Sequence, residues 1–150
     1  MSESLLFLMG QFPARFPTDC RYAKNHMWAR RMAGGWRFGF SAYAVRLLRD
    51  VYFLDWSIDA GTRVKKGDEI GAIESSKAES SLYAPIDGRL VAFNPVLMAD
   101  PSAINVDTYQ AGWLFLLDGT GQSLLKPNDY LLHLEAVWKV TQRTIKGQLS

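Results

Sequence analysis

Cysteine and long apolar runs are what this chain has least of. Cys20 is the single cysteine, so no disulfide can form within the chain, which favours a reducing compartment. A membrane-spanning helix needs about 20 consecutive apolar residues, and the sequence has no such run. The short apolar run over residues 5–9 follows Glu3 with no basic region before it, which does not fit a signal peptide. We therefore expect a cytoplasmic protein that does not insert into a membrane.

Excess charge and the motifs of catalytic sites are also missing. The net charge is +2, from 17 Lys and Arg and 15 Asp and Glu residues, which is too small to indicate a nucleic-acid partner. Cys20, His26 and His133 lack the spacing of metal ligands, so we expect no metal site. The sequence has no nucleophile–base motif and no phosphate-binding glycine loop. These absences predict a protein without catalytic residues of its own.

The composition that is present suits one globular domain. The chain has 150 residues, of which 48% are apolar, enough for a hydrophobic core. We expect residues 1–20 to form an N-terminal extension that packs on the domain or is mobile, and residues 21–150 to form the domain. Pro13 and Pro17 predict an irregular lead-in over residues 11–25.

The middle of the chain has the pattern of a β protein. Strand-like runs on both sides of Gly34-Gly35 predict a β-hairpin. Ser41 is a candidate cap for a short helix over residues 42–48, and residues 51–56 have the composition of a strand. Short runs separated by glycines follow, as in β-sandwiches and β-barrels.

The C-terminal part has a helical pattern instead. From about residue 128, apolar residues recur on one helical face, and Asn128 or Asp129 can cap the helix. We predict a C-terminal amphipathic helix that packs on the β core. The fold class is therefore mostly β with flanking helices.

Lys77 lies at the centre of the segment that carries the chemistry. Within residues 61–91, apolar strand residues flank a polar centre of small residues, which predicts a hairpin with Lys77 exposed at its tip. An amine at an exposed turn can be acylated to give a long, flexible arm, and a carrier must offer such an arm to several active sites in turn. Taken alone, a lysine in a polar turn is most often only a solvated surface residue.

This segment resembles the lipoyl/biotinyl-attachment domain, and most closely the H-protein family of the glycine cleavage system. The family pattern is Glu-Ser-x-Lys-Ala, then Ala-Pro, then Gly. The matching residues here are Glu74-Ser75-Ser76-Lys77-Ala78, Ala84-Pro85 and Gly88. Biotin carriers usually have methionine on both sides of the lysine, whereas Ser76 and Ala78 are the neighbours here, which favours lipoate.

The resemblance extends over roughly residues 20–118. Several local patterns match in the family's order: Tyr22, His26-x-Trp28, Ser41-Ala42-Tyr43-Ala44, Asn94-Pro95-Val96-Leu97, residues 100–105, Tyr109 and Gly112-Trp113-Leu114-Phe115. The fold that the resemblance implies is a flattened β-barrel, or barrel-sandwich hybrid, of two antiparallel sheets with helices at the edges.

The resemblance also implies a function and a set of site residues. Lipoate would be attached to Lys77 by an amide, with Gly61, Glu74 and Gly88 helping the lipoyl-attaching enzyme to recognise the hairpin. The arm would carry an aminomethyl group from glycine decarboxylase (P-protein) to the aminomethyltransferase (T-protein), and dihydrolipoyl dehydrogenase would reoxidise it. The positions that match the family's arm cleft are His26, Met27, Tyr43 and Ser81.

The sequence departs from the family near that cleft. Met27, Ser81 and Ala111 stand where the family often has acids, and Arg49 replaces the usual glycine. An acid would favour a cationic aminomethyl group. Three alternatives therefore stay open beside glycine cleavage: a lipoyl carrier for another lipoate-dependent enzyme system, a lipoate-relay protein, and an unmodified binding module.

Overall fold

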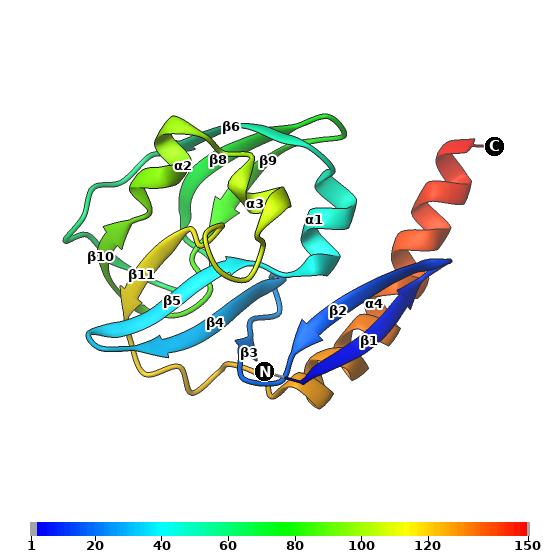
Figure 1. Ribbon diagram of the computed structural model, residues 1–150, viewed down its shortest axis with the longest axis horizontal. Helices are drawn as coiled ribbons and strands as arrows, with labels where there is room; N and C mark the ends of the chain where they lie inside the picture. The colour runs from blue at the N-terminus through cyan, green and yellow to red at the C-terminus, as the bar shows by residue number, and fades with distance from the viewer. Residues whose placement is uncertain (1–2, 150) are drawn as a thin grey trace.

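The computed structural model describes residues 3–149, with side chains up to residue 142, and folds them into two facing antiparallel sheets with helices around them (Figure 1). Within these residues, a six-stranded sheet has the order β3-β4-β5-β11-β10-β7. Its strands are Arg21–Tyr22 (β3), Met27–Met32 (β4), Gly35–Phe40 (β5), Phe115–Asp118 (β11), Gly88–Phe93 (β10) and Arg63–Val64 (β7).

The second sheet carries the site. It has the order β6-β8-β9, with strands Val51–Trp56 (β6), Glu69–Ser75 (β8) and Glu79–Tyr83 (β9). The four helices of the described residues are Ala42–Leu48 (α1), Pro95–Ala99 (α2), Ala103–Val106 (α3) and Pro127–Leu149 (α4). Within this part of the chain, no helix is both long and apolar enough to cross a membrane.

One hydrophobic core joins the two sheets. The buried side chains of the six-stranded sheet include Phe38, Leu90 and Phe115, and they share a cluster with Leu54, Ile70 and Ile73 of the other sheet. Alternating apolar residues along each strand supply these side chains, as facing sheets require. The predicted mostly β fold of two antiparallel sheets with flanking helices is confirmed, and the sheets stack as a flattened sandwich.

The beginning of the chain is more regular than its prolines predict. Strand β1 (Ser4–Met9) pairs with β2 (Phe12–Pro17) in a hairpin, so the expected irregular lead-in over residues 11–25 is wrong for its first half. Pro13 and Pro17 lie four positions apart in β2, and a strand in a two-stranded sheet has a free edge, where a missing N–H is tolerated.

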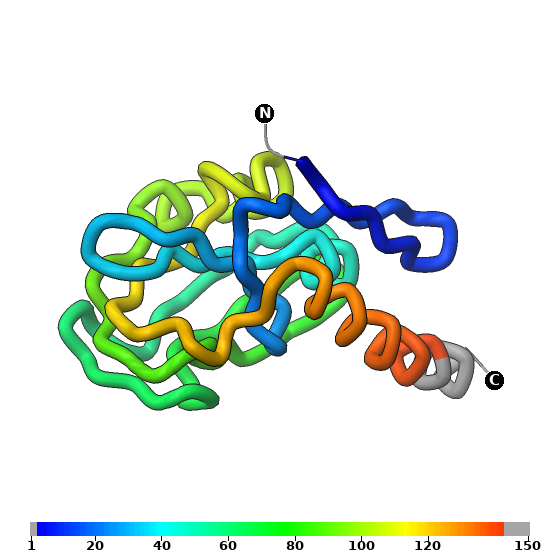
Figure 2. Tube along the Cα trace, turned by 90° about the horizontal axis from the view of Figure 1, so that it is seen from below, coloured from blue at the N-terminus to red at the C-terminus, as the bar shows by residue number. Residues whose placement is uncertain are grey.

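A second core fixes this N-terminal hairpin to the domain. Phe16 of the hairpin packs with Tyr22, Tyr43 and Tyr130, all of them 0–1% exposed. The rings of Tyr22 and Tyr130 are stacked with their centroids 4.6 Å apart. In both ribbon and tube views the hairpin and α4 extend from the same end of the sandwich (Figures 1 and 2). The extension therefore packs on the domain.

Two predicted helix caps have different outcomes. Ser41 occupies the cap position of α1, but its side chain makes no capping bond, and its hydroxyl instead lies 2.8 Å from the hydroxyl of Tyr130. Helix α4 begins at Pro127, whose fixed φ suits a first helical position. Asn128 and Asp129 therefore lie inside the helix, and the prediction that one of them caps it is wrong.

Candidate functional site

Lys77 is exposed at the tip of the hairpin formed by β8 and β9. The buried Ser75 shapes this tip: its hydroxyl oxygen accepts the backbone N–H of Ala78 at 3.1 Å, and its own N–H donates to the Ala78 carbonyl at 2.8 Å. A compact turn held by its own hydrogen bonds leaves the lysine side chain pointing away from the sheet. The predicted hairpin with an exposed lysine is thus present.

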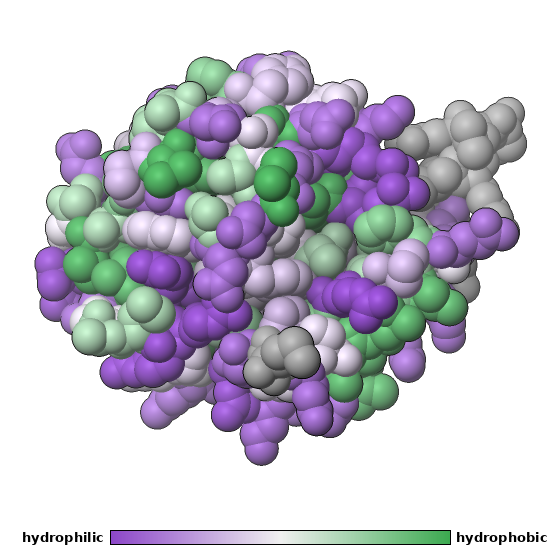
Figure 3. Space-filling model, in the orientation of Figure 1, coloured by the Kyte–Doolittle hydropathy of each residue, from purple (hydrophilic) through white to green (hydrophobic). Residues whose placement is uncertain are grey.

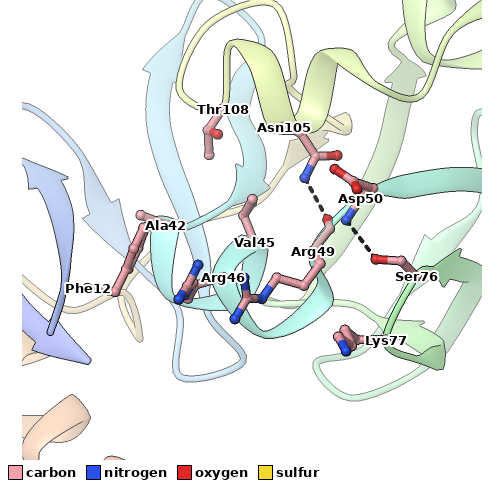
Figure 4. A pocket seen from close by; sticks show the side chains of 10 residues that line it. All are labelled: Phe12, Ala42, Val45, Arg46, Arg49, Asp50, Ser76, Lys77, Asn105 and Thr108. Carbon is pink, nitrogen blue, oxygen red and sulfur yellow. Dashed lines mark hydrogen bonds between the residues drawn. The ribbon is translucent and has the colours of Figure 1, made fainter. Parts of the chain in front are cut away.

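The tip is also tied to the start of β6. The N–H of Ser76 donates to the Asp50 carbonyl at 2.9 Å, and the Ser76 hydroxyl accepts the Asp50 N–H at 3.2 Å (Figure 4). These two bonds join the turn beside Lys77 to the link between α1 and β6. The lysine is therefore carried by a rigid support, which a carrier needs if partner enzymes are to meet the same surface each time.

Of the three residues expected to mark the hairpin for lipoylation, only Glu74 lies within it, and Gly61 and Gly88 lie outside its two strands. Glu74 is half-buried and lies opposite Glu79, close to the tip. Gly61 and Gly88 lie where β7 pairs with β10 in the six-stranded sheet: the Gly61 N–H donates to the Leu90 carbonyl at 2.7 Å, and Gly88 pairs with Val64. The local structure explains why both positions hold glycine. Gly61 has φ 94°, a conformation that favours glycine, and a Cβ on Gly88 would lie 2.4 Å from the Asp118 carbonyl oxygen.

A largely apolar cleft of about 240 Å³ opens between this hairpin, α1 and the start of β4. His26, Met27 and Ser81, three of the four residues expected in the arm cleft, line it. The fourth, Tyr43, does not line it: Tyr43 is 1% exposed, and its ring packs behind His26 with the centroids 4.5 Å apart. We call this cavity the apolar cleft.

His26 is held in the cleft wall by a buried polar chain. Its Nδ1 lies 2.9 Å from the Tyr130 hydroxyl, which lies 2.8 Å from the Ser41 hydroxyl. Burial, followed by the nearby His133, lowers the pKa of His26 from 6.5 to about 4. The imidazole is therefore neutral at pH 7, and its Nδ1 can accept a hydrogen bond from the Tyr130 hydroxyl.

One acidic group near the cleft was missed from the sequence. Glu69 is exposed and accepts a hydrogen bond from the Ser81 hydroxyl at 2.5 Å, so a carboxylate contacts the serine that replaces the family's acid. The two residues come from opposite strands of the hairpin. The register shifts between Glu69 and Gly71, and such a bulge is what a pairing pattern read from sequence cannot place.

A second, larger depression lies beside Lys77 itself. It measures about 510 Å³, and we call it the basic recess (Figure 4). Lys77, Arg46 and Arg49 line it, together with Phe12 of the N-terminal hairpin and Asn105. The Asn105 amide donates to the Arg49 carbonyl at 2.6 Å and accepts the Val51 N–H at 2.9 Å. The sequence marked Arg49 as a departure from the family, but it did not predict this recess.

No candidate metal centre accompanies these features in the part of the chain that the structure describes, since no three His, Cys, Asp or Glu side chains gather there. Cys20 is buried beside Arg30 and Asp19, and burial raises the pKa of its thiol to about 12. His133 lies on α4, where its ring contacts the Lys24 carbonyl at 3.3 Å.

Comparison with known proteins identifies the family. The family model for the glycine cleavage H-protein matches residues 20–144. The glycine cleavage system H protein of Enterobacter sp. (strain 638) is 37% identical over 75% of this chain and 97% of its own length. That of Anaeromyxobacter sp. (strain K) is 39% identical over 68% of this chain and 79% of its own.

The structural comparison agrees. The crystal structure of a glycine cleavage system H protein from Mycobacterium marinum superposes with a TM-score of 0.67 at 32% identity, covering 77% of this chain and 95% of that one. The residues 20–144 that the family model matches include both facing sheets and the lysine hairpin, whereas the N-terminal hairpin lies before them. The chain belongs to the glycine cleavage H-protein family.

Proposed function

We propose that this protein is the lipoyl carrier of a glycine cleavage system. Lipoate is attached to Lys77 through an amide, and the arm takes an aminomethyl group from glycine decarboxylase to the aminomethyltransferase. Dihydrolipoyl dehydrogenase then reoxidises the carrier. The observation that carries the proposal is the exposed Lys77 at the tip of a fixed hairpin, in a chain that belongs to the H-protein family.

The chain contributes presentation rather than catalysis in this proposal. Bound lipoate supplies a disulfide that can be reduced and can hold a one-carbon unit, and the partner enzymes perform the reactions. Ser75 and Ser76 hold the tip so that Lys77 projects to solvent, where the lipoyl-attaching enzyme can reach its amine. Glu74, Gly61 and Gly88 are the residues we propose this enzyme recognises.

The apolar cleft fits the lipoyl arm. Its walls include Met27, Leu48 and Ile73, which suit an apolar ring with sulfur atoms. Ser80 lines the same cleft three residues from Lys77, so their Cα atoms lie at most about 11 Å apart. An arm extended from the lysine can therefore lie in the cleft between visits to partner enzymes, with His26 and Ser81 as its polar contacts.

The Ser81–Glu69 pair supports aminomethyl as the cargo. A cationic amine in the apolar cleft gains from a nearby carboxylate, and the exposed Glu69, although it does not line the cleft, is hydrogen-bonded to the lining residue Ser81. Its place differs from that of the family's acids at positions 27 and 81, which are a buried methionine and a serine here. The negative charge thus lies outside the cleft, on an exposed side chain that is hydrogen-bonded to the cleft wall.

A second candidate function rests on the same two positions. Because Met27 and Ser81 are uncharged and His26 is neutral, the cleft wall itself offers no charge to a cationic group. A carrier for another lipoate-dependent enzyme system, or a lipoate relay, would need no charge in the cleft wall. Loading of the arm by glycine decarboxylase distinguishes glycine cleavage from both, and transfer of lipoate from Lys77 to another protein would identify a relay.

The attachment is tested by mass. The chain is incubated with a lipoyl-attaching enzyme and its lipoyl donor, and the intact mass is recorded for the wild type, Lys77→Arg and the control Lys65→Arg. Lys65 is exposed on the neighbouring turn. We expect one lipoyl increment in the wild type and in the control, and none in Lys77→Arg. An increment that persists without Lys77 would reject the attachment site, and an unmodified wild type would favour a plain binding module.

A further inference from the structure

Three cationic side chains face the basic recess beside the tip. They are Arg46, Arg49 and Lys77, and Asp50 is the one acid among the lining residues (Figure 4). Within the described side chains, the single ion pair is Arg30 with Asp19, so none of these three cations is paired with a carboxylate. The cations thus outnumber the single lining carboxylate, and an excess of positive charge favours an anion in the space between them.

The two arginines are presented by local structure that orients them. They lie three residues apart on or just after α1, which places them on one side of the helix. The guanidinium of Arg46 lies 4.2 Å from the centre of the Phe12 ring, a cation–π contact made by the N-terminal hairpin. A segment outside the family match therefore helps to position a cation next to the arm.

Arg49 occupies a backbone conformation that suits glycine better than arginine. It ends α1 with φ 64° and ψ −138°, and its carbonyl is fixed by the Asn105 amide at 2.6 Å. A side chain with a Cβ is strained in this region, and such strain persists where the residue has a use. In Figure 4 the Arg49 guanidinium extends along the recess toward that of Arg46.

The positive charge of the recess outlasts modification of the lysine. Acylation turns the Lys77 ammonium into a neutral amide, whereas guanidinium groups stay charged at every relevant pH. Arg46 and Arg49 thus remain as a pair of cations beside the arm in the loaded carrier. With Asp50 counted, the recess of the loaded carrier keeps a net positive charge, which attracts an anionic group of a partner.

We propose that Arg46 and Arg49 dock carboxylate side chains at the rim of the active-site entrance of the enzyme that loads the arm. This rests on the proposed function, under which that enzyme is glycine decarboxylase. The arm can enter an active site only if the enzyme's entrance faces the tip, so the rim of that entrance meets the recess. Guanidinium groups bind carboxylates in paired, oriented hydrogen bonds.

The surroundings of the recess fit a protein partner. Val106 directly follows the recess residue Asn105 and is 84% exposed, and Val96 and Met98 of α2 are 51% and 57% exposed. Figure 3 shows hydrophobic side chains among hydrophilic ones over α2 and α3. Charged groups beside exposed apolar side chains are the composition of a transient protein interface.

The test compares two double charge reversals in the lipoylated protein. Arg46→Glu/Arg49→Glu alters the recess, and Arg21→Glu/Arg31→Glu alters two exposed arginines of β3 and β4 on the other sheet. Each lowers the net charge by four, from +2 to −2. Intact mass confirms equal lipoylation, circular dichroism confirms the fold, and the source's glycine decarboxylase loads each carrier from glycine at several salt concentrations.

We expect the recess variant to raise KM for the carrier about 10- to 100-fold with kcat unchanged and a weaker dependence on salt, and the control to stay within about threefold. Equal losses in both variants would indicate steering by net charge and would overturn the proposal, as would no loss in either. Selective inhibition by phosphate over chloride at equal ionic strength would overturn it in favour of a phosphate site. An unloaded wild type would reject the proposed function itself.

Discussion

Removing the hydroxyl of Tyr130 should destabilise the protein far more than the loss of one oxygen atom suggests. Tyr130 is 0% exposed, and its hydroxyl joins His26, at 2.9 Å, to Ser41, at 2.8 Å. Tyr130→Phe keeps the ring stacked on Tyr22 but leaves two buried polar groups without their partner. Each such loss costs about 1–1.5 kcal/mol, so we expect the free energy of unfolding to fall by about 2–3 kcal/mol.

The assay is urea unfolding together with a thermal melt. A loss of about 2–3 kcal/mol lowers Tm by about 5–10 °C in a domain of this size and shifts the urea midpoint without changing the slope. Tyr52→Phe is the matched control, because Tyr52 is 60% exposed on β6 and its hydroxyl has little to lose, so its change should stay within about 0.5 kcal/mol. Equal changes in the two variants would refute the role given to the buried polar chain.

Three further predictions concern the titration of His26, the close contact at Gly39 and the backbone of Arg49. Because burial lowers the pKa of His26 from 6.5 to about 4, the unfolded chain binds a proton between these pH values that the folded chain does not. The free energy of unfolding should therefore fall by up to about 3 kcal/mol as the pH drops from about 6.5 to 4. Urea titrations at several pH values should show that His26→Asn flattens this dependence. A Cβ on Gly39 would lie 2.5 Å from the indole of the fully buried Trp28, so Gly39→Ala should lower the free energy of unfolding in urea by about 3 kcal/mol. A change below about 0.5 kcal/mol would contradict that close contact. Arg49→Gly should raise the free energy of unfolding by about 1 kcal/mol because φ 64° suits glycine, while raising KM for arm loading; a destabilised variant would show that the backbone is not strained.

The elements with local signals were predictable from the sequence. Gly34-Gly35 marks the turn between β4 and β5, and Ser41 marks the start of α1 at residue 42. The polar tip around Lys77 marks the hairpin of β8 and β9. Each of these signals lies within a few residues of the structure that it specifies, so no distant contact is needed to read it.

The features that depend on distant contacts were not predictable. Tyr43 matches a cleft position in the family but packs behind His26, where α4 covers it: its ring meets that of Trp138, and its hydroxyl lies 3.1 Å from that of Thr141. The N-terminal hairpin was hidden by its prolines, although Gly10, with φ 64°, marks its turn. The basic recess needs Phe12, α1 and α3 to meet beside Lys77, which is decided by tertiary packing alone.

The proposed function is tested most directly by the mass of the arm. The lipoylated protein is mixed with glycine and the source's own glycine decarboxylase, already shown to load a known H-protein, and the intact mass is recorded before and after. A carrier of the glycine cleavage system gains one aminomethyl unit on the lipoyl increment, and Lys77→Arg gains nothing. A wild-type lipoyl increment that stays unchanged would contradict the proposal and assign the arm to another lipoate-dependent system.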